Sequence, residues 1–327
     1  MSEELKPQAA APATPQAAPQ APAAAPKKPA APAAAAPAAP AENDCHVRTI
    51  ERAAFRKEME RLHKEEHMDF LECLTGIDRE DDGLAVIYHL ESTATGKRTC
   101  VQVVCEGRET PNVPTVSDLW DIANIYEREV YDFYGIIFTG HPDMRRIYMR
   151  EDWVGYPFRK DDETEKNNPL RMTNEPLADT TDTYTLTPDG TLTKEQRNIF
   201  GEEDYVVNIG PQHPSTHGVL HFRVCLQGEV IKKIDPILGY IHRGVEKISE
   251  QMTYPQTLAL TDRLDYLGAM QNRHALCMCI EKAMGVEVSD RVKVIRTIMD
   301  ELQRIDSHIL FFSCLAQDLG ATTAFLY

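Results

Sequence analysis

Apolar positions in the first half of the chain recur at both helical and strand periods. A cap at Thr49 is expected to begin a helix whose apolar stripe is made of Phe55, Met59 and Leu62. The apolar runs 84–90 and 99–104, with a polar turn between them, predict strands on which this helix docks. A second, capped amphipathic helix is predicted over 117–132. Its charged residues indicate either a solvent-exposed face laced with salt bridges or a docking surface: Glu127, Arg128, Glu129 and Asp132.

The second half of the chain changes from strand patterns to helix patterns. Three strands are predicted, at residues 205–209, 219–226 and 229–234. A helix over 265–284 should end at Gly285, because glycine favours the left-handed C-cap. From Asp290 a long helix is expected to pack through the stripe Ile295, Ile298, Met299, Leu302, Ile305, Ile309 and Phe312. The sequence stops soon after this stripe and looks cut short, so we expect this domain to lack helices that would cover it.

These patterns divide the chain into four segments. Residues 1–42 are almost entirely Ala, Pro and Gln and predict a disordered, extended spacer. An α+β domain is expected over 43–161, and residues 162–203 are polar and turn-rich and predict a long surface connection. A second domain over 204–327 should place a small antiparallel sheet before a helical bundle. The predicted fold class is therefore α+β.

Composition removes several functional classes. The 327 residues carry a formal net charge of −16, and no basic face is visible that could replace the counterions of a nucleic acid. The acidic N-terminus has no apolar signal region, and no apolar run reaches the ~20 residues that cross a bilayer. No G-x-G-x-x-G after a strand and no P-loop is present, so nothing indicates a nucleotide site on this chain.

The sequence does not support a metal site either. His63 and His67 have the spacing of zinc ligands on a helix, but Lys64 stands where the metalloprotease motif requires glutamate. Cys277 and Cys279 are two apart on a predicted helix, so their thiols point to different faces. The eight cysteines contain no C-x-x-C pair and are expected to be reduced, mostly buried thiols.

The loop 208–219 contains two histidines, two prolines and two glycines between apolar runs. Proline fixes φ and glycine permits unusual backbone angles, so such a loop is stiff and can hold an imidazole in place. Taken alone, His213 and His217 fit ordinary loop histidines that shape the backbone. By the same measure Tyr266 fits a core tyrosine, and Asp318 fits a cap of a helix or turn.

Two groups of motifs resemble one family. Three segments are similar to the 30 kDa-type subunit of respiratory complex I: residues 126–135 (YEREVYDFYG), 140–146 (GHPDMRR) and 153–161. Four others are similar to its 49 kDa-type subunit: residues 208–220, 239–247 (GYIHRGVEK), 262–266 (DRLDY) and 318–321. Their order on one chain resembles the fused C/D subunit of bacterial NADH-quinone oxidoreductase.

The resemblance implies a site for the head group of a quinone, ubiquinone or menaquinone, next to a neighbouring iron–sulfur subunit. The family's head-group histidine corresponds to His217, its partner tyrosine to Tyr266, and the acid that supports the histidine to Asp318. Arg243 corresponds to the arginine beside the terminal iron–sulfur cluster, whose ligands belong to the neighbouring subunit. The implied partners are the other peripheral-arm subunits and the membrane subunits, with the chain peripheral on the cytoplasmic side of the bacterial inner membrane.

Two alternatives come from the same motifs. The related large subunits of nickel–iron hydrogenases carry an Arg-x-Cys-Gly-x-Cys motif where this chain has residues 263–268 (RLDYLG), so the two thiolates that would hold nickel are missing. A module that binds neighbouring subunits and does no chemistry is also consistent with the motifs. Activity of variants at His217 and Tyr266 distinguishes it from a quinone site.

Overall fold

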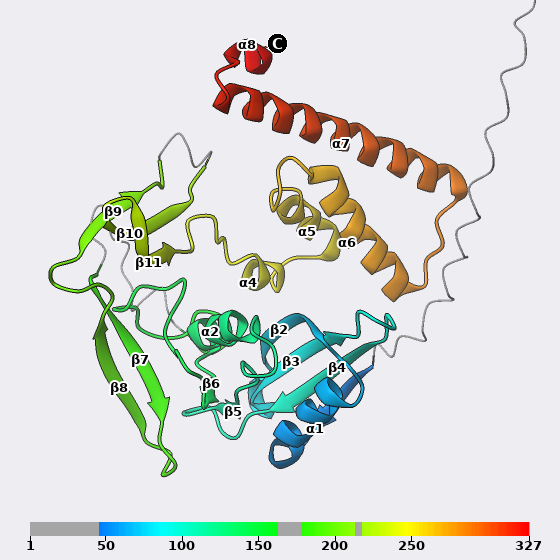
Figure 1. Ribbon diagram of the computed structural model, residues 1–327. Helices are drawn as coiled ribbons and strands as arrows, with labels where there is room; N and C mark the ends of the chain where they lie inside the picture. The colour runs from blue at the N-terminus through cyan, green and yellow to red at the C-terminus, as the bar shows by residue number, and fades with distance from the viewer. Residues whose placement is uncertain (1–45, 163–177, 213–217, 327) are drawn as a thin grey trace, which may run out of the picture. The chain divides into compact units, whose positions relative to one another are not determined.

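The computed structural model describes residues 46–162, 178–212 and 218–326 (Figure 1). The fold is mixed α+β, as predicted. The predicted spacer 1–42 lies outside the described residues, as do residues 163–177 of the predicted connection and the loop histidines His213 and His217.

A four-stranded sheet organises the first part of the chain. Its strands have the order β1-β4-β3-β2, and β1 runs parallel to β4 while the other neighbours are antiparallel. They are β1 (Val47–Ile50), β2 (Phe70–Asp78), β3 (Leu84–Glu91) and β4 (Arg98–Val104). Helix α1 (Arg52–Lys64) follows β1, a short 3-10 helix η1 (Glu80–Asp82) links β2 to β3, and α2 (Ala123–Tyr134) comes later. The predicted strands 84–90 and 99–104 are confirmed.

Both helices cover the same face of this sheet. Phe55 of α1 contacts Tyr88 of β3, with ring centroids 5.2 Å apart. The ring of Tyr134 in α2 lies over Gly76 of β2, where an added Cβ would come within 2.5 Å of it. The register pairs Gly76 with Val86, which lies on the same side of β3 as Tyr88. The core of this part is therefore one-sided.

The predicted starts of both helices were wrong. Thr49 pairs with Gln102 inside β1, and α1 begins at Arg52 without a side-chain cap. Helix α2 begins at Ala123 rather than near residue 117, because the turns before it bring Trp120 into the core. There its Nε1 donates to the carbonyl of Met68 at 3.0 Å. Helix α2 is followed by Gly135, whose left-handed backbone conformation caps its C-terminal end.

The predicted surface connection contains a hairpin that the sequence pattern does not predict. Strands β7 (Thr180–Leu186) and β8 (Leu192–Asn198) pair antiparallel, and a separate parallel pair is formed by β5 (Asn112–Pro114) and β6 (Ile137–Thr139). The hairpin is anchored to the first part by Tyr184, whose ring lies 5.3 Å from that of Tyr131 and whose N–H donates to the Met144 carbonyl at 2.8 Å. These strands consist mostly of polar residues and lack an apolar run, so the sequence resembles a connection, although β-branched threonine is common in strands.

The second sheet agrees with the prediction. Strands β9 (Tyr205–Ile209), β10 (His221–Gln227) and β11 (Val230–Ile237) form an antiparallel sheet in the order β11-β10-β9. Buried Arg223 donates two hydrogen bonds to the carboxylate of Asp235 across β10 and β11, at 2.9 and 2.7 Å.

Helices follow this sheet to the end of the described chain. They are α4 (Val245–Ser249), α5 (Tyr254–Thr261), α6 (Ala269–Met284), α7 (Asp290–Asp318) and α8 (Thr322–Leu326). The predicted cap at Gly285 is confirmed, with φ of +66°. Helices α6 and α7 are joined by Arg296 to Glu281 and by His274 to Asp300. No helix among the described residues is long and apolar enough to cross a membrane.

The apolar stripe of α7 is largely uncovered within the described residues. Ser313 is the one buried residue of this helix. Large side chains along the stripe expose about half of their surface or more, among them Ile298, Leu302, Ile305, Ile309 and Phe312. An uncovered face of this size is typical of a surface that another protein segment covers.

Candidate functional site

The structure places three of the four predicted site residues at the surface of the chain. Tyr266 lies in the turn between α5 and α6, and 78% of its surface is exposed. Asp318 is the last residue of α7, and Arg243 lies two residues before the start of α4; both are exposed. His217 lies outside the described residues. The convergence of His217 and Tyr266 on one small oxidant therefore stays a prediction.

Acidic side chains shape the turn that carries Tyr266. The carboxylate of Asp265 accepts the N–H of Leu267 at 3.0 Å, and its carbonyl accepts the N–H of Gly268 at 3.0 Å. The preceding Asp262 pairs with Arg273 of α6 at 3.1 Å. These bonds fix the backbone on both sides of Tyr266, whose side chain is largely exposed. The alternative interpretation of Tyr266 as a core tyrosine is therefore wrong for the described chain.

The charged residues of α2 are not a solvent-exposed face, so that interpretation was wrong. Glu127 and Asp132 are fully buried, and Arg128 is 9% exposed. Arg128 donates to two backbone carbonyls, at Arg145 and Arg146, at 3.2 and 3.3 Å. These side chains hold together the segments 126–135 and 140–146, which stand as separate motifs in the sequence.

Glu127 is a buried acid, and no Lys or Arg of the described residues forms an ion pair with it. Its Oε1 accepts the N–H of Val116 at 2.7 Å, and the hydroxyl of Thr115 lies 2.5 Å from Oε2. His141 is 3.9 Å away, but its Nδ1 accepts the N–H of Asp143 and its Nε2 lies 3.1 Å from the Asn124 carbonyl, as in a neutral imidazole. Burial lowers the pKa of His141 and raises the pKa of Glu127 to about 8.

Asp132 is a buried carboxylate with a complete set of donors. One oxygen accepts the backbone N–H groups of three successive residues, Ile147, Tyr148 and Met149, at 3.1, 2.7 and 2.9 Å. The other accepts Nη1 of Arg146, which is itself buried, at 2.8 Å. Asp132 therefore fixes the backbone that carries the ring of Tyr148.

A third carboxylate of α2 faces the second half of the chain. Glu129 and Glu246 of α4 line a small cavity of about 50 Å³, together with Phe133, Tyr134 and Phe158. Burial, with a further contribution from the negative charge of Glu246, raises the pKa of Glu129 to about 7. The carboxyl of Glu129 therefore gains or loses its proton near neutral pH, and the charge between α2 and α4 changes with it.

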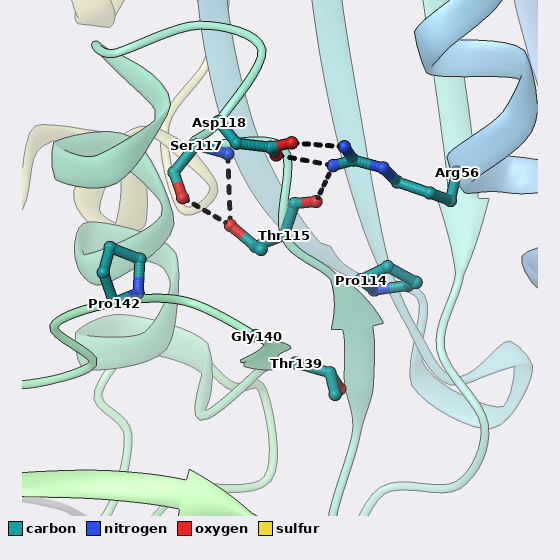
Figure 2. A pocket seen from close by; sticks show the side chains of 8 residues that line it. All are labelled: Arg56, Pro114, Thr115, Ser117, Asp118, Thr139, Gly140 and Pro142. Carbon is teal, nitrogen blue, oxygen red and sulfur yellow. Dashed lines mark hydrogen bonds and ion pairs between the residues drawn. The ribbon is translucent and has the colours of Figure 1, made fainter.

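A larger cavity, of about 460 Å³, opens beside α1 and is lined by Arg56 and Asp118 with Pro114, Thr115, Ser117, Thr139, Gly140 and Pro142 (Figure 2). Figure 2 shows that the guanidinium of Arg56 is directed at Asp118 and at the Thr115 carbonyl, with N–O distances of 2.5 to 2.7 Å. Its Nε also donates to Glu60 at 3.0 Å. Because the three guanidinium nitrogens of Arg56 already have acceptors, this cavity offers no cation for an anionic ligand.

Comparisons with known proteins agree with the motif assignment. Residues 48–168 match the family model described as respiratory-chain NADH dehydrogenase, 30 Kd subunit. The chain is 65% identical over 291 residues, 86% of its length, to a protein of Bacteroides thetaiotaomicron that is named as the C/D subunit of NADH-quinone oxidoreductase. It is 64% identical over the same length to the protein of that name from Bacteroides fragilis.

The chain belongs to the family of NADH-quinone oxidoreductase C/D subunits. A more distant member, from Chromohalobacter salexigens, is 38% identical over 79% of this chain. This C/D-family chain spans about half the length of the relatives it matches, 55% of the Bacteroides thetaiotaomicron protein and 45% of the Chromohalobacter salexigens protein. The 30 Kd match covers the first sheet, α1 and α2, so these elements form the C-type part of the chain.

The described residues of this C/D-family chain do not fit an iron–sulfur cluster. Their cysteines are scattered over separate elements, namely Cys73, Cys100, Cys105, Cys225, Cys277, Cys279 and Cys314. In residues 46–162, 178–212 and 218–326, no three His, Cys, Asp or Glu side chains are grouped so that they could hold a metal. A cluster needs a set of thiolates close together, and these parts of the chain do not provide one.

Proposed function

We propose that this chain helps to form the quinone-reduction site of a proton-translocating NADH-quinone oxidoreductase, in the peripheral arm on the cytoplasmic side of a bacterial inner membrane. In this proposal it binds the other peripheral-arm subunits, above all an iron–sulfur subunit, and the membrane subunits. The observation that carries the proposal is the 65% identity to a C/D subunit over 86% of the chain.

The proposed chemistry uses His217 and Tyr266 as proton donors to the quinone. A quinone that takes up two electrons and two protons becomes a hydroquinone, and negative charge develops on its carbonyl oxygens along the way. The phenol of Tyr266 donates to one such oxygen, and the imidazole of His217 donates and is then reprotonated. Asp318 keeps the imidazole protonated near neutral pH, because a carboxylate beside an imidazole favours its charged form.

The electrons are supplied, in this proposal, by an iron–sulfur cluster that the neighbouring subunit holds. Arg243 faces that subunit and, always cationic, favours the electron resting nearby. The exposed positions of Tyr266 and Arg243 support this arrangement, since a side chain that serves a site shared with another subunit must be free of its own core.

Quinone reduction in membranes that contain the assembled complex tests the proposal. We expect Tyr266→Phe and His217→Ala to lower turnover by about 10²-fold, the usual effect of removing a positioned proton donor. Tyr254→Phe is the matched control, because Tyr254 of α5 is 71% exposed and is given no role. Native gels of the same membranes show whether the complex assembles.

Asp318→Asn separates proton supply from assembly. Without the carboxylate, the pKa of a neighbouring imidazole falls, so turnover at neutral pH should fall and the alkaline limb of the pH profile should move to lower pH. Assembly should be intact. If His217→Ala and Tyr266→Phe assemble and reduce quinone at the wild-type rate, the proposed chemistry is wrong and the chain acts as an assembly module.

A further inference from the structure

We infer that His242 and Lys247 are positioning residues for Arg243: they anchor the segment 239–247 to the C-type part of the chain and thereby fix where Arg243 points. The inference rests on the proposed function, which places Arg243 against a partner subunit. The segment leaves β11 and enters α4, and Arg243 is an exposed residue between the two anchors.

The first anchor is an aromatic stack. The imidazole of His242 lies 4.9 Å from the ring of Phe133 and 4.7 Å from that of Tyr148, between centroids. Phe133 also stacks on Phe158, at 4.2 Å and within 9° of parallel. Offset stacks of this kind contribute beyond the area they bury. The three partner rings come from the segments 126–135, 147–149 and 153–161 of the C-type part, so the stack joins the two halves of the chain.

The backbone around His242 fixes the ring in this position. The His242 N–H donates to the Gly239 carbonyl at 3.0 Å, and the Gly244 N–H donates to Nδ1 of His242 at 3.3 Å. Gly239 and Gly244 have φ of +104° and +60°, a region that glycine enters without strain. Hydrogen bonds of the His242 backbone and side chain therefore restrain the backbone on both sides of Arg243.

The second anchor is a charged one. Nζ of Lys247 donates to the carbonyls of Phe158 and Arg159 at 3.3 and 3.1 Å. A third tie runs to the second sheet, where the hydroxyl of Tyr240 lies 3.0 Å from Nδ1 of buried His221. Because the segment is held to the C-type part at His242 and at Lys247, the backbone of Arg243 has little freedom to move relative to that part.

The chain of contacts begins at a buried carboxylate. Asp132 binds the backbone of residues 147–149, and this holds the Tyr148 ring against His242. The order Asp132, Tyr148, His242, Arg243 thus connects a residue of α2 to the proposed site. Asp132, Tyr148 and the neighbouring pair His242 and Arg243 come from three separate stretches of the chain. No single sequence motif therefore contains all four residues.

Hydrogen–deuterium exchange of the full chain tests the anchors directly. We expect His242→Ala to speed exchange of the amides of residues 240–247 about tenfold, which corresponds to about 1.4 kcal/mol. His242→Phe, which restores a stacking ring, should return most of the protection. Lys247→Met should speed exchange in the same segment, whereas Lys293→Met on exposed α7 is the matched control and should not.

Turnover of the assembled complex tests whether the anchors act through Arg243. His242→Ala should lower kcat several-fold with little change in the KM for quinone, and His242→Phe should restore it. If His242 acts through Arg243, the double variant His242→Ala/Arg243→Ala is no slower than Arg243→Ala alone, because the two changes remove one function.

The possible results separate the two proposals. Unchanged turnover in Arg243→Ala would overturn the proposed role of Arg243 and with it the positioning inference. Slow turnover in Arg243→Ala, combined with wild-type exchange of residues 240–247 in His242→Ala, would overturn the positioning inference alone. Additive effects of the two substitutions on kcat would also overturn it.

Discussion

The buried acid Glu127 gives a prediction that can be worked out quantitatively. Its pKa is about 8 in the folded chain, against an ordinary value of 4.5. Between these two pH values the folded chain keeps a proton that the unfolded chain has lost. The contribution of Glu127 to the free energy of unfolding should therefore be highest below about pH 4.5, fall by about 1.4 kcal/mol per pH unit, and level off above about pH 8.

Glu127→Gln removes this slope. The glutamine oxygen still accepts the Val116 N–H, and its amide donates to the Thr115 hydroxyl as a neutral acid would. Relative to wild type, the variant should gain about 3 kcal/mol in free energy of unfolding between pH 5.5 and 7.5. Burial lowers the pKa of His141 in both proteins, so its contribution cancels in this difference.

Urea unfolding followed by tryptophan fluorescence measures this difference. Both tryptophans of the chain, Trp120 and Trp153, lie in the C-type part, so the signal reports on the unit that contains Glu127. Glu109→Gln, at an exposed position, is the matched control and should follow the wild-type pH profile. Parallel profiles for wild type and Glu127→Gln would refute the reasoning, since they would show that Glu127 ionises in the folded chain as it does when unfolded.

Three further predictions concern packing. Asp132→Asn should lower the free energy of unfolding by about 3–5 kcal/mol in the same urea experiment, because it leaves the buried Arg146 guanidinium without its counter-ion; a loss below 1 kcal/mol would contradict this. Gly135→Ala should lower it by about 1–3 kcal/mol and reduce the Tm, because φ is +71° there and the new Cβ would meet the Tyr156 ring at 2.5 Å. Leu302→Gln should leave stability within about 0.5 kcal/mol but reduce self-association of the purified chain in light scattering, because Leu302 is 52% exposed on an apolar face; an unchanged apparent mass would argue against that face as a contact surface.

The elements that the sequence predicted well are those whose pattern and burial agree. Residues 84–90 and 205–209 have apolar runs and are strands, and the left-handed Gly285 ends its helix as expected. The starts of α1 and α2 were misplaced because no side chain caps either helix, so Thr49 and Ser117 gave a signal that the structure does not use. Tertiary pairing outweighed the local preference in both cases.

The surroundings of the candidate site residues could be predicted from the sequence less well than the helices and strands. Exposure of Tyr266 could not be predicted, since a tyrosine suits a core and a surface equally. Glu127 and Asp132 were misread because charged residues on a helix are usually solvated. The available signal was their position among aromatic residues in 126–135, where a solvated face would carry few rings. The His242 stack depends on contacts between segments about a hundred residues apart, and no local pattern reports such contacts.

The small contact at His242 and Lys247 has a consequence for how the two halves meet. One ring stack and one ammonium group would hardly keep two separate proteins together, since stable complexes bury far larger surfaces. In a fused chain the partners are already tethered, and the tether supplies an effective concentration in the millimolar range. Fusion into one chain therefore allows weak contacts to determine how the two halves are positioned. If the halves were two separate polypeptides, this contact surface would have to be larger or bind more tightly.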